Sequence, residues 1–380
     1  MQKKLIALAI AGLAAAPAFA QSNVTVYGYM DMAMVNRSGN DGGVQGVKST
    51  TALNSGVSAG NRIGFKGTEA LGNGTSALFQ HELQIFSDVG NLSGGNNGVS
   101  ATGAGNNGQV GVRNSYVGLT GNWGTAVAGH LDGARYGVAL KYDAFSGGTV
   151  AQGVSIQTHA SRADNAIAYI SPTWSGFSFI AAYTTNLVGQ EGAGNVGDAR
   201  LWAIQPNYTN GPLALTFNYE SLKVKEAAFG NKADVEIVAM GGSYDFNIVK
   251  IMGYYENVKR DDPAWALANS VSLADQRAYT LGATIPVGAN GLVRMNYSKL
   301  DDKTTRNGDC NKFGIGYKHS LSKRTFVYTD YARINNDNVN SKCTIATSAS
   351  TNSVDNYGNA TPGAGGLGVN GFDIGLAHSF

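Results

Sequence analysis

The sequence predicts an all-β protein, a 16-stranded antiparallel β-barrel that crosses a membrane. Apolar side chains recur at every second position in one stretch after another, which is the period of a strand with two unlike faces. Short turns alternate with longer polar segments along the chain. Charged residues make up only 14% of the 380 residues, against about 25% in ordinary soluble domains. Mean hydropathy is −0.13, which indicates one lipid face and one wet face rather than a bundle of apolar helices.

The first 20 residues, "MQKKLIALAIAGLAAAPAFA", have the pattern of a secretory signal peptide. Lys3 and Lys4 precede an apolar run over residues 5–16, and an A-x-A cleavage pattern ends at Ala20. The apolar run is shorter than the roughly 18 residues that a spanning helix needs. We therefore expect a cleaved signal peptide at residues 1–20 and an exported barrel at residues 21–380.

The mature chain is close to electrically neutral. Without Lys3 and Lys4 the basic residues fall from 28 to 26, which equals the 26 acidic residues. Bulk charge therefore gives no argument for a nucleic-acid partner.

Residues 61–83, "NRIGFKGTEALGNGTSALFQHEL", are typical of a hairpin with one apolar and one charged face. Ile63 and Phe65 share one side of the first strand, and Arg62 and Lys66 share the other. A soluble β-sandwich would place the charges outside in water, whereas a membrane barrel would place them inside around its lumen. The regular alternation of short and long connections favours the barrel over the sandwich.

Three later stretches repeat this alternation. "LALTFNYESL" sets Leu215 and Phe217 against Thr216 and Glu220, and the other two are "KFGIGYKHSL" and "GFDIGLAHSF". None of the prolines interrupts a predicted strand interior, where proline would remove a ladder hydrogen bond.

The connections fall into two length classes. Short turns are predicted at residues 71–74, 122–124, 173–176, 210–211, 246–247, 287–291 and 320–323. Longer loops are predicted at residues 38–60, 88–108, 131–163, 186–199, 227–232, 259–275, 301–309 and 336–370. In membrane barrels the short turns are periplasmic and the long loops extracellular. The first strand (24–36) and the last (372–380) would pair and close the ring, leaving no unpaired edge.

The chemistry-bearing residue types give no enzyme or metal pattern. The histidines and the two cysteines lack metal-ligand spacing, and adjacent His and Ser residues in strands point to opposite faces, which excludes a hydrolase dyad there. We expect no catalysis and no cofactor. In an oxidising compartment Cys310 and Cys343 favour a disulfide, with two free thiols as the alternative.

Several motifs taken together resemble a known family. "VTVYGYMD", the hairpin quoted above, "YVGLTGNWGTAVAG", "SRADNAIAYISPTWSGFSFIAAY", "HSLSKRTFVY" and the final "GLAHSF" look like the general, trimeric Gram-negative porins of betaproteobacteria, including their anion-selective members. The resemblance spans the mature chain. It implies a homotrimer, passive diffusion through a water-filled pore, a third long loop folded into the lumen, and a C-terminal Phe380 read by the barrel-assembly machinery. The chain departs from the family pattern at His81 and His130, and "DAFSGG" at residues 143–148 lacks a proline.

Candidate pore residues come from strand parity and from the resemblance. Arg62 and Lys66 face inward because a charge on the lipid face near the midplane costs about 2–4 kcal/mol. Glu82 is expected almost directly across from Arg62, where a structural ion pair in the wall is the alternative role.

The resemblance adds pore positions at Arg162 and Arg113. Arg113 has awkward parity, since it shares a face with Val117 and Leu119, and a β-bulge or a one-residue slip to Asn114 would resolve this. Asp132, Arg135, Lys141 and Asp143 in the predicted inward loop either line the constriction or are ordinary solvated loop charges.

The sequence thus predicts an outer membrane porin that passes ions and small hydrophilic solutes, with anion preference set by lumen arginines. The alternatives are a solute-specific channel and a surface adhesin or receptor barrel. The expected partners are two further copies of the chain, outer membrane lipid and lipopolysaccharide.

Overall fold

The computed structural model describes residues 23–40, 49–88, 112–157, 162–187, 199–224, 233–260, 275–304, 307–337, 341, 343–345 and 367–380. The predicted signal peptide lies outside these residues, as do the predicted loop 227–232 and most of loops 88–108 and 259–275. No helix within the described residues is both long and apolar enough to cross a membrane.

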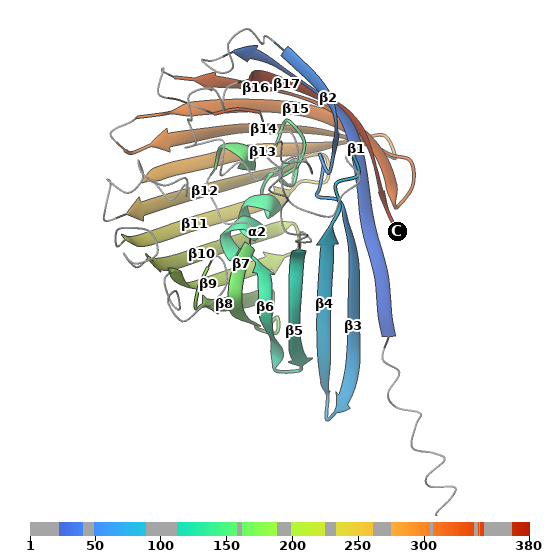
Figure 1. Ribbon diagram of the computed structural model, residues 1–380, viewed down its shortest axis with the longest axis vertical. Helices are drawn as coiled ribbons and strands as arrows, with labels where there is room; N and C mark the ends of the chain where they lie inside the picture. The colour runs from blue at the N-terminus through green and yellow to red at the C-terminus, as the bar shows by residue number, and fades with distance from the viewer. Residues whose placement is uncertain are drawn as a thin grey trace, which may run out of the picture.

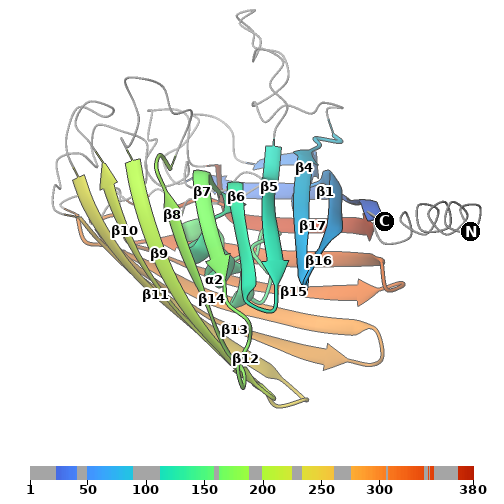
Figure 2. The ribbon, with the colours of Figure 1, turned by 90° about the horizontal axis from the view of Figure 1, so that it is seen from below.

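The described strands form one closed antiparallel ring (Figures 1 and 2). Each strand from β3 to β17 pairs with the next along the chain, and β1 pairs with both β3 and β17. β2 and β3 both pair with β1, along different halves of it, and so share one strand position in the ring. The 17 strands therefore occupy 16 positions, which confirms the predicted barrel.

The bounds of the strands are β1 (Asn23–Asn40), β2 (Ser49–Ser55), β3 (Arg62–Gly72), β4 (Thr75–Gln84), β5 (Val112–Gly121), β6 (Gly124–Asp132), β7 (Arg162–Ile170), β8 (Phe177–Thr184), β9 (Ala199–Asn210), β10 (Leu213–Val224), β11 (Ala233–Asp245), β12 (Lys250–Arg260), β13 (Gln276–Val287), β14 (Gly291–Asp302), β15 (Cys310–Ser320), β16 (Thr325–Asn336) and β17 (Leu367–Ser379).

The predicted first loop, residues 38–60, is wrong in extent. β1 continues to Asn40, and its distal half pairs with β2 over Met32–Ser38 and Ser49–Ser55. Residues 23–29, the N-terminal half of β1, pair with β3. Residues 56–61 therefore interrupt what would otherwise be one barrel strand made of β2 and β3. There the chain turns into the barrel: Val57 is fully buried and its carbonyl accepts a hydrogen bond from the Thr149 amide.

Burial is inverted relative to a soluble protein. Val117, Ile167 and Leu281 are each about 60% exposed on the outer surface, whereas Glu256 and Asp373 are fully buried inside. The alternation in β10, β15 and β17 follows the predicted parity, with apolar side chains outward. This arrangement suits a barrel whose outer face meets lipid and whose charges face its interior.

The short turns use residues that tolerate a left-handed backbone. In the β3–β4 turn Gly72, Asn73 and Gly74 have φ values of 89°, 50° and 73°. Glycine and asparagine are the residues that adopt this region at least cost. The predicted turn at residues 71–74 is confirmed.

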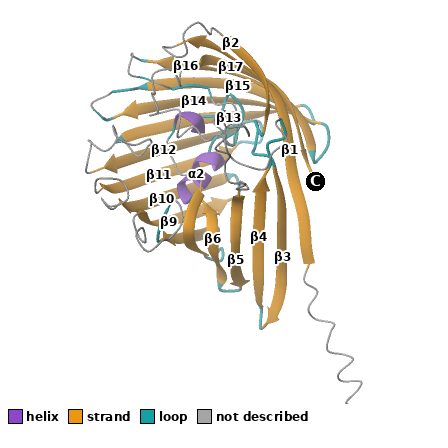
Figure 3. Ribbon diagram, viewed as in Figure 1, coloured by secondary structure: helices purple, strands orange, loops and turns teal. Residues whose placement is uncertain are grey.

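Two short helical segments lie inside the barrel rather than in its wall (Figure 3). They are α2 (Ala134–Lys141) and the 3₁₀ turn η1 (Val154–Ile156), both between β6 and β7. The period-2 alternation in the sequence predicts the strands of the wall but gives no sign of α2. We call residues 133–157 the inward loop, because they fold into the ring as the third long connection is expected to do.

Candidate pore constriction

The inward loop packs on one side of the barrel interior. Val138, Tyr142, Phe145 and Val150 are at most 2% exposed and join a buried cluster with wall residues such as Tyr254. The wall residues of this cluster come from β1, from Val57 and from β11–β16. Among the described residues, the wall formed by β3–β9 contributes none to it.

Close backbone approach allows this packing. A side chain at Gly241 would place its Cβ 1.9 Å from the Tyr142 ring, so only glycine leaves room for it. The Tyr142 hydroxyl lies 3.0 Å from Thr216 Oγ1 on β10.

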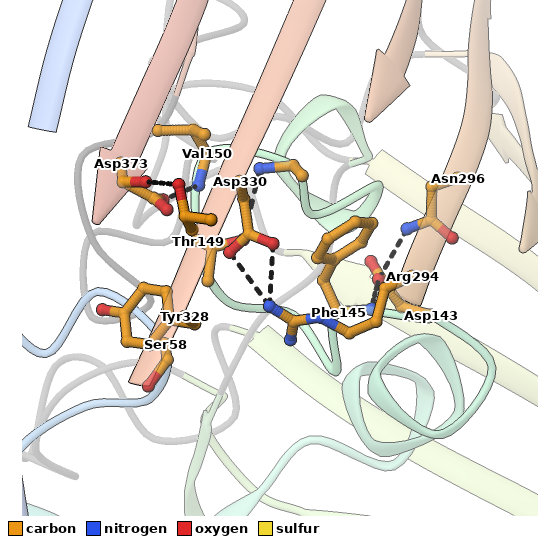
Figure 4. Close-up of polar contacts among 12 residues, drawn as sticks. Ser58, Asp143, Phe145, Thr149, Val150, Arg294, Asn296, Tyr328, Asp330 and Asp373 are labelled. Carbon is orange, nitrogen blue, oxygen red and sulfur yellow. Dashed lines mark hydrogen bonds and ion pairs between the residues drawn. The ribbon is translucent and has the colours of Figure 1, made fainter. Parts of the chain in front are cut away.

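Polar contacts pin the same loop to the far wall (Figure 4). The Val150 amide donates to Asp373 on β17 at 2.8 Å, and Asn296 on β14 donates to Asp143 at 2.7 Å. Lys312 on β15 donates to the Gln152 carbonyl at 2.7 Å. The loop is therefore anchored on three separate strands.

Asp143 holds the turn of the inward loop. Its carboxylate accepts hydrogen bonds from the amides of Phe145, Gly153 and Val154, and from Asn296. Burial raises the pKa of Asp143, and these donors oppose the shift without cancelling it. We assign Asp143 to the structure of the loop, because its carboxylate is buried and fully engaged.

Arg135 is also buried, with a side chain 3% exposed, whereas the sequence left open a lining charge of the constriction or a solvated loop charge. Its Nη1 donates to Glu256 Oε2 at 2.8 Å, and its Nε lies 3.6 Å from Glu220 Oε2. Burial lowers the pKa of Arg135, but the carboxylates of Glu256 and Glu220 raise it by more. This ion-pair cluster fastens the start of α2 to β10 and β12.

Arg62 and Arg113 share one carboxylate on the opposite wall. Arg62 Nε lies 3.5 Å from Glu82 Oε1, and Arg113 Nε lies 3.8 Å from Glu82 Oε2. The Tyr27 hydroxyl also donates to Glu82 at 2.9 Å. Glu82 on β4 thus lies between one arginine on β3 and one on β5, the two strands that flank β4.

The position of Glu82 differs in one respect from the sequence expectation. Gln84 is the residue directly across from Arg62, and Glu82 is across from Gly64. Glu82 reaches Arg62 diagonally, since both side chains lie on the same face of the hairpin. The shared face is as predicted, and the register is wrong by two residues.

A β-bulge places Arg113 on that inner face. The pairing of β4 and β5 shifts between His81 and Leu83, so that Arg113 and Asn114 together stand opposite Glu82. The awkward parity of Arg113 is resolved in this way.

Arg162 begins β7 directly across from Asp132 at the end of β6. Its Nη1 lies 2.9 Å from Asp132 Oδ1, and Asn114 donates to the other carboxylate oxygen at 2.9 Å. The Arg162 guanidinium also lies 5.9 Å from the ring centre of Tyr136 on α2. Arg62, Arg113 and Arg162 lie on or at the start of β3, β5 and β7, and we call these three residues the arginine ladder.

Two further predicted residues are exposed lysines. Lys66 lies with its Nζ 5.0 Å from the Tyr27 ring centre, beside the arginine ladder. Lys141, at the end of α2, contacts Thr216 Oγ1 at 3.3 Å. Neither makes an ion pair among the described contacts.

A model of the Gram-negative porin family matches residues 7–339. The chain belongs to this family. Porins are channels rather than enzymes, and they lie in the outer membrane of Gram-negative bacteria. The recognition from sequence motifs is confirmed.

Known porins resemble this chain in sequence and in the structure of the barrel. It is 30% identical to "Outer membrane porin protein 32" of Delftia acidovorans over 88% of this chain and 90% of that one. The "Anion-selective porin from Comamonas acidovorans" superposes with a TM-score of 0.71 at 26% identity, over 95% of this chain and 100% of that one. A trimer form of OmpT from Vibrio cholerae shares the fold at 17% identity, with a TM-score of 0.59, over 94% and 99%.

Sequence reasoning misses several interior charges of this porin. Arg294 donates to both carboxylate oxygens of Asp330 at 2.8 and 2.9 Å, and Asp373 and Lys312 hold the inward loop. Strand parity already places Lys312 and Asp373 on the inner face. It cannot name their partners, because those partners lie far away in sequence on a folded loop.

Cys310 and Cys343 form a disulfide in this porin. It links the start of β15 to a segment in which Ile345 is buried and its amide donates to the Gly368 carbonyl. The described part of the last long connection is thereby held at the barrel mouth.

An interior cavity of about 300 Å³ lies between the start of α2 and the wall formed by β4–β9. The Arg162–Asp132 ion pair stands on its rim, and its lining is mostly apolar, including Leu131, Ala166 and Ala182.

Proposed function

We propose that this porin is a passive diffusion channel with a preference for anions. The arginine ladder supports the proposal: among the described residues Arg62 and Arg113 share the single carboxylate of Glu82, and Arg162 pairs with Asp132. A low-dielectric wall around a narrow aqueous passage strengthens the field of such an excess charge. The name of the anion-selective relative from Comamonas acidovorans supports the same preference.

The test replaces all three ladder arginines with glutamine and measures the reversal potential across planar bilayers in a KCl gradient. The ratio of chloride to potassium permeability is expected to fall severalfold. Lys223→Gln is the matched control, because Lys223 is exposed and pairs only distantly with Asp234 at 3.9 Å. An unchanged permeability ratio in the triple variant would mean that the arginines have only a structural role in the barrel wall.

The functional assembly we propose is a homotrimer in the outer membrane, in contact with lipid and lipopolysaccharide. The broad apolar outer surface supports burial against neighbouring copies as well as lipid. Export would use residues 1–20 as a cleaved signal peptide, and the exposed C-terminal Phe380 would present the barrel to its assembly machinery.

A further inference from the structure

The inner wall of the barrel carries an apolar row that a purely aqueous pore does not require. Neighbouring strands pair Leu78 with Gly118, Gly118 with Val127, and Val127 with Ala168. The row continues through Ala182 and Ala203 and ends at Glu220 on β10. Lumen-facing positions of a diffusion barrel are ordinarily polar, so this row calls for a physical reason.

Small side chains along the row leave space beside α2. The cavity of about 300 Å³ extends from this row to the Arg162–Asp132 pair. An engineered cavity of roughly half that volume, about 150 Å³, suffices to hold benzene. One aromatic or branched aliphatic group therefore fits without displacing the wall.

The rim of the cavity offers both signs of charge. Asp132 has a half-exposed side chain (48%), and Arg162, 2.9 Å away, is 14% exposed. A solute with a single charge would be attracted by one member of this pair and repelled by the other. A zwitterion can satisfy both at once, with its carboxylate at Arg162 and its ammonium at Asp132.

We propose that this cavity is a binding site for apolar α-amino acids, with the zwitterionic head at the Arg162–Asp132 pair and the side chain over Leu131, Ala166 and Ala182. The proposal rests on the proposed channel function and adds a solute class to it. Polar amino acids share the head but gain nothing from the apolar wall, so they pass without being retained.

The test uses single channels of the intact porin in planar bilayers with KCl on both sides. L-phenylalanine is expected to reduce or interrupt the current with an affinity at least about tenfold above that of glycine, because only phenylalanine buries an apolar side chain. Phenethylammonium and 3-phenylpropanoate, which each carry one charge, are expected to act more weakly than phenylalanine. Equal effects of glycine and phenylalanine, or equal effects of either singly charged analogue, would overturn the proposal.

A pair of variants locates the site. Ala182→Leu adds three carbon atoms where the bound side chain would lie and should weaken the phenylalanine effect about tenfold through steric overlap. Ala181→Leu adds the same atoms on the opposite face of β8, toward lipid, and should leave the effect unchanged. A phenylalanine effect that survives Ala182→Leu would place binding elsewhere. The reversal potential recorded in the same chamber reports the ion preference separately, so a failure of the amino-acid site is distinguishable from a failure of the channel proposal.

Discussion

At the scale of single residues, the balance of charge in the lumen depends on a few shared contacts. Glu82 is the countercharge of both Arg62 and Arg113, at 3.5 and 3.8 Å. Removing it leaves two arginines facing the passage without their carboxylate. One buried acid therefore limits the positive field of two of the three ladder arginines.

Glu82→Gln should increase the anion preference of the channel. The chloride-to-potassium permeability ratio from reversal potentials is expected to rise severalfold, because the positive field is less neutralised. Glu69→Gln removes the same charge from an exposed position near the β3–β4 turn and should have little effect. A ratio that falls in Glu82→Gln would contradict this role for Glu82.

The buried carboxylate of Asp143 predicts a pH dependence of stability. Burial raises its folded-state pKa above the ordinary 3.8, so the folded barrel holds this proton more tightly than the unfolded chain does. The stabilisation by Asp143 is fully present below pH 3.8 and is lost as pH rises through the raised folded-state pKa.

Asp143→Asn cannot titrate and isolates that contribution. The free energy of unfolding of the native porin minus that of the variant should decrease as pH rises above 3.8. Urea unfolding in detergent at a series of pH values measures it. A difference that is flat or rises with pH would show that the hydrogen-bond donors outweigh burial.

At the scale of elements, the inward loop depends on the wall for its position. Arg135 joins α2 to Glu220 and Glu256, and removing the cation would leave two buried carboxylates without it. Breaking a buried ion pair from one side typically costs about 3–5 kcal/mol.

Arg135→Gln should therefore destabilise the barrel by about 3–5 kcal/mol and increase the noise of the open-channel current, because the start of α2 loses its anchor. Lys141→Gln removes an exposed cation from the same helix and is expected to change little. Equal stability of the two variants by urea unfolding would contradict the anchoring role.

The disulfide should stabilise the last long connection. Cys310 and Cys343 are 33 residues apart, and closing a loop of that size stabilises a fold by about 2–4 kcal/mol. The Cys310→Ser/Cys343→Ser double variant should lose about that much in urea unfolding. Mass spectrometry of the native protein should show a gain of two hydrogen atoms on reduction, and its absence would contradict the bridge.

Much of the wall could be predicted from the sequence, because strand parity is a local property. The faces of Phe372 and Asp373 follow from period-2 alternation alone. The partner of Arg62 does not, because shifting the centre of the hairpin turn by one residue moves the partner by two positions.

The inward loop is less predictable for a physical reason. α2 is eight residues long and is held by tertiary contacts rather than by its own periodicity. The roles of Arg135 and Asp143 as buried anchors likewise depend on strands that are distant in sequence. Their residue types suggest pore charges, and only the folded loop shows that they are enclosed.

At the scale of the whole molecule, the inward loop and the arginine ladder belong to different parts of the wall. Figure 1 shows α2 inside the ring; the inward loop packs mainly on the later strands, whereas the ladder arginines come from β3, β5 and β7. This asymmetry places fixed positive charge on the part of the described wall that the buried cluster of the inward loop does not include. Ion preference is therefore a property of the whole arrangement rather than of any one arginine.

The most direct measurement is the reversal potential of the unmodified porin in a planar bilayer with a KCl gradient. A potential displaced toward the chloride equilibrium value is expected from the three positive charges of the arginine ladder. A potential displaced toward the potassium equilibrium value would contradict the proposed anion preference, while leaving the barrel and its family unchanged.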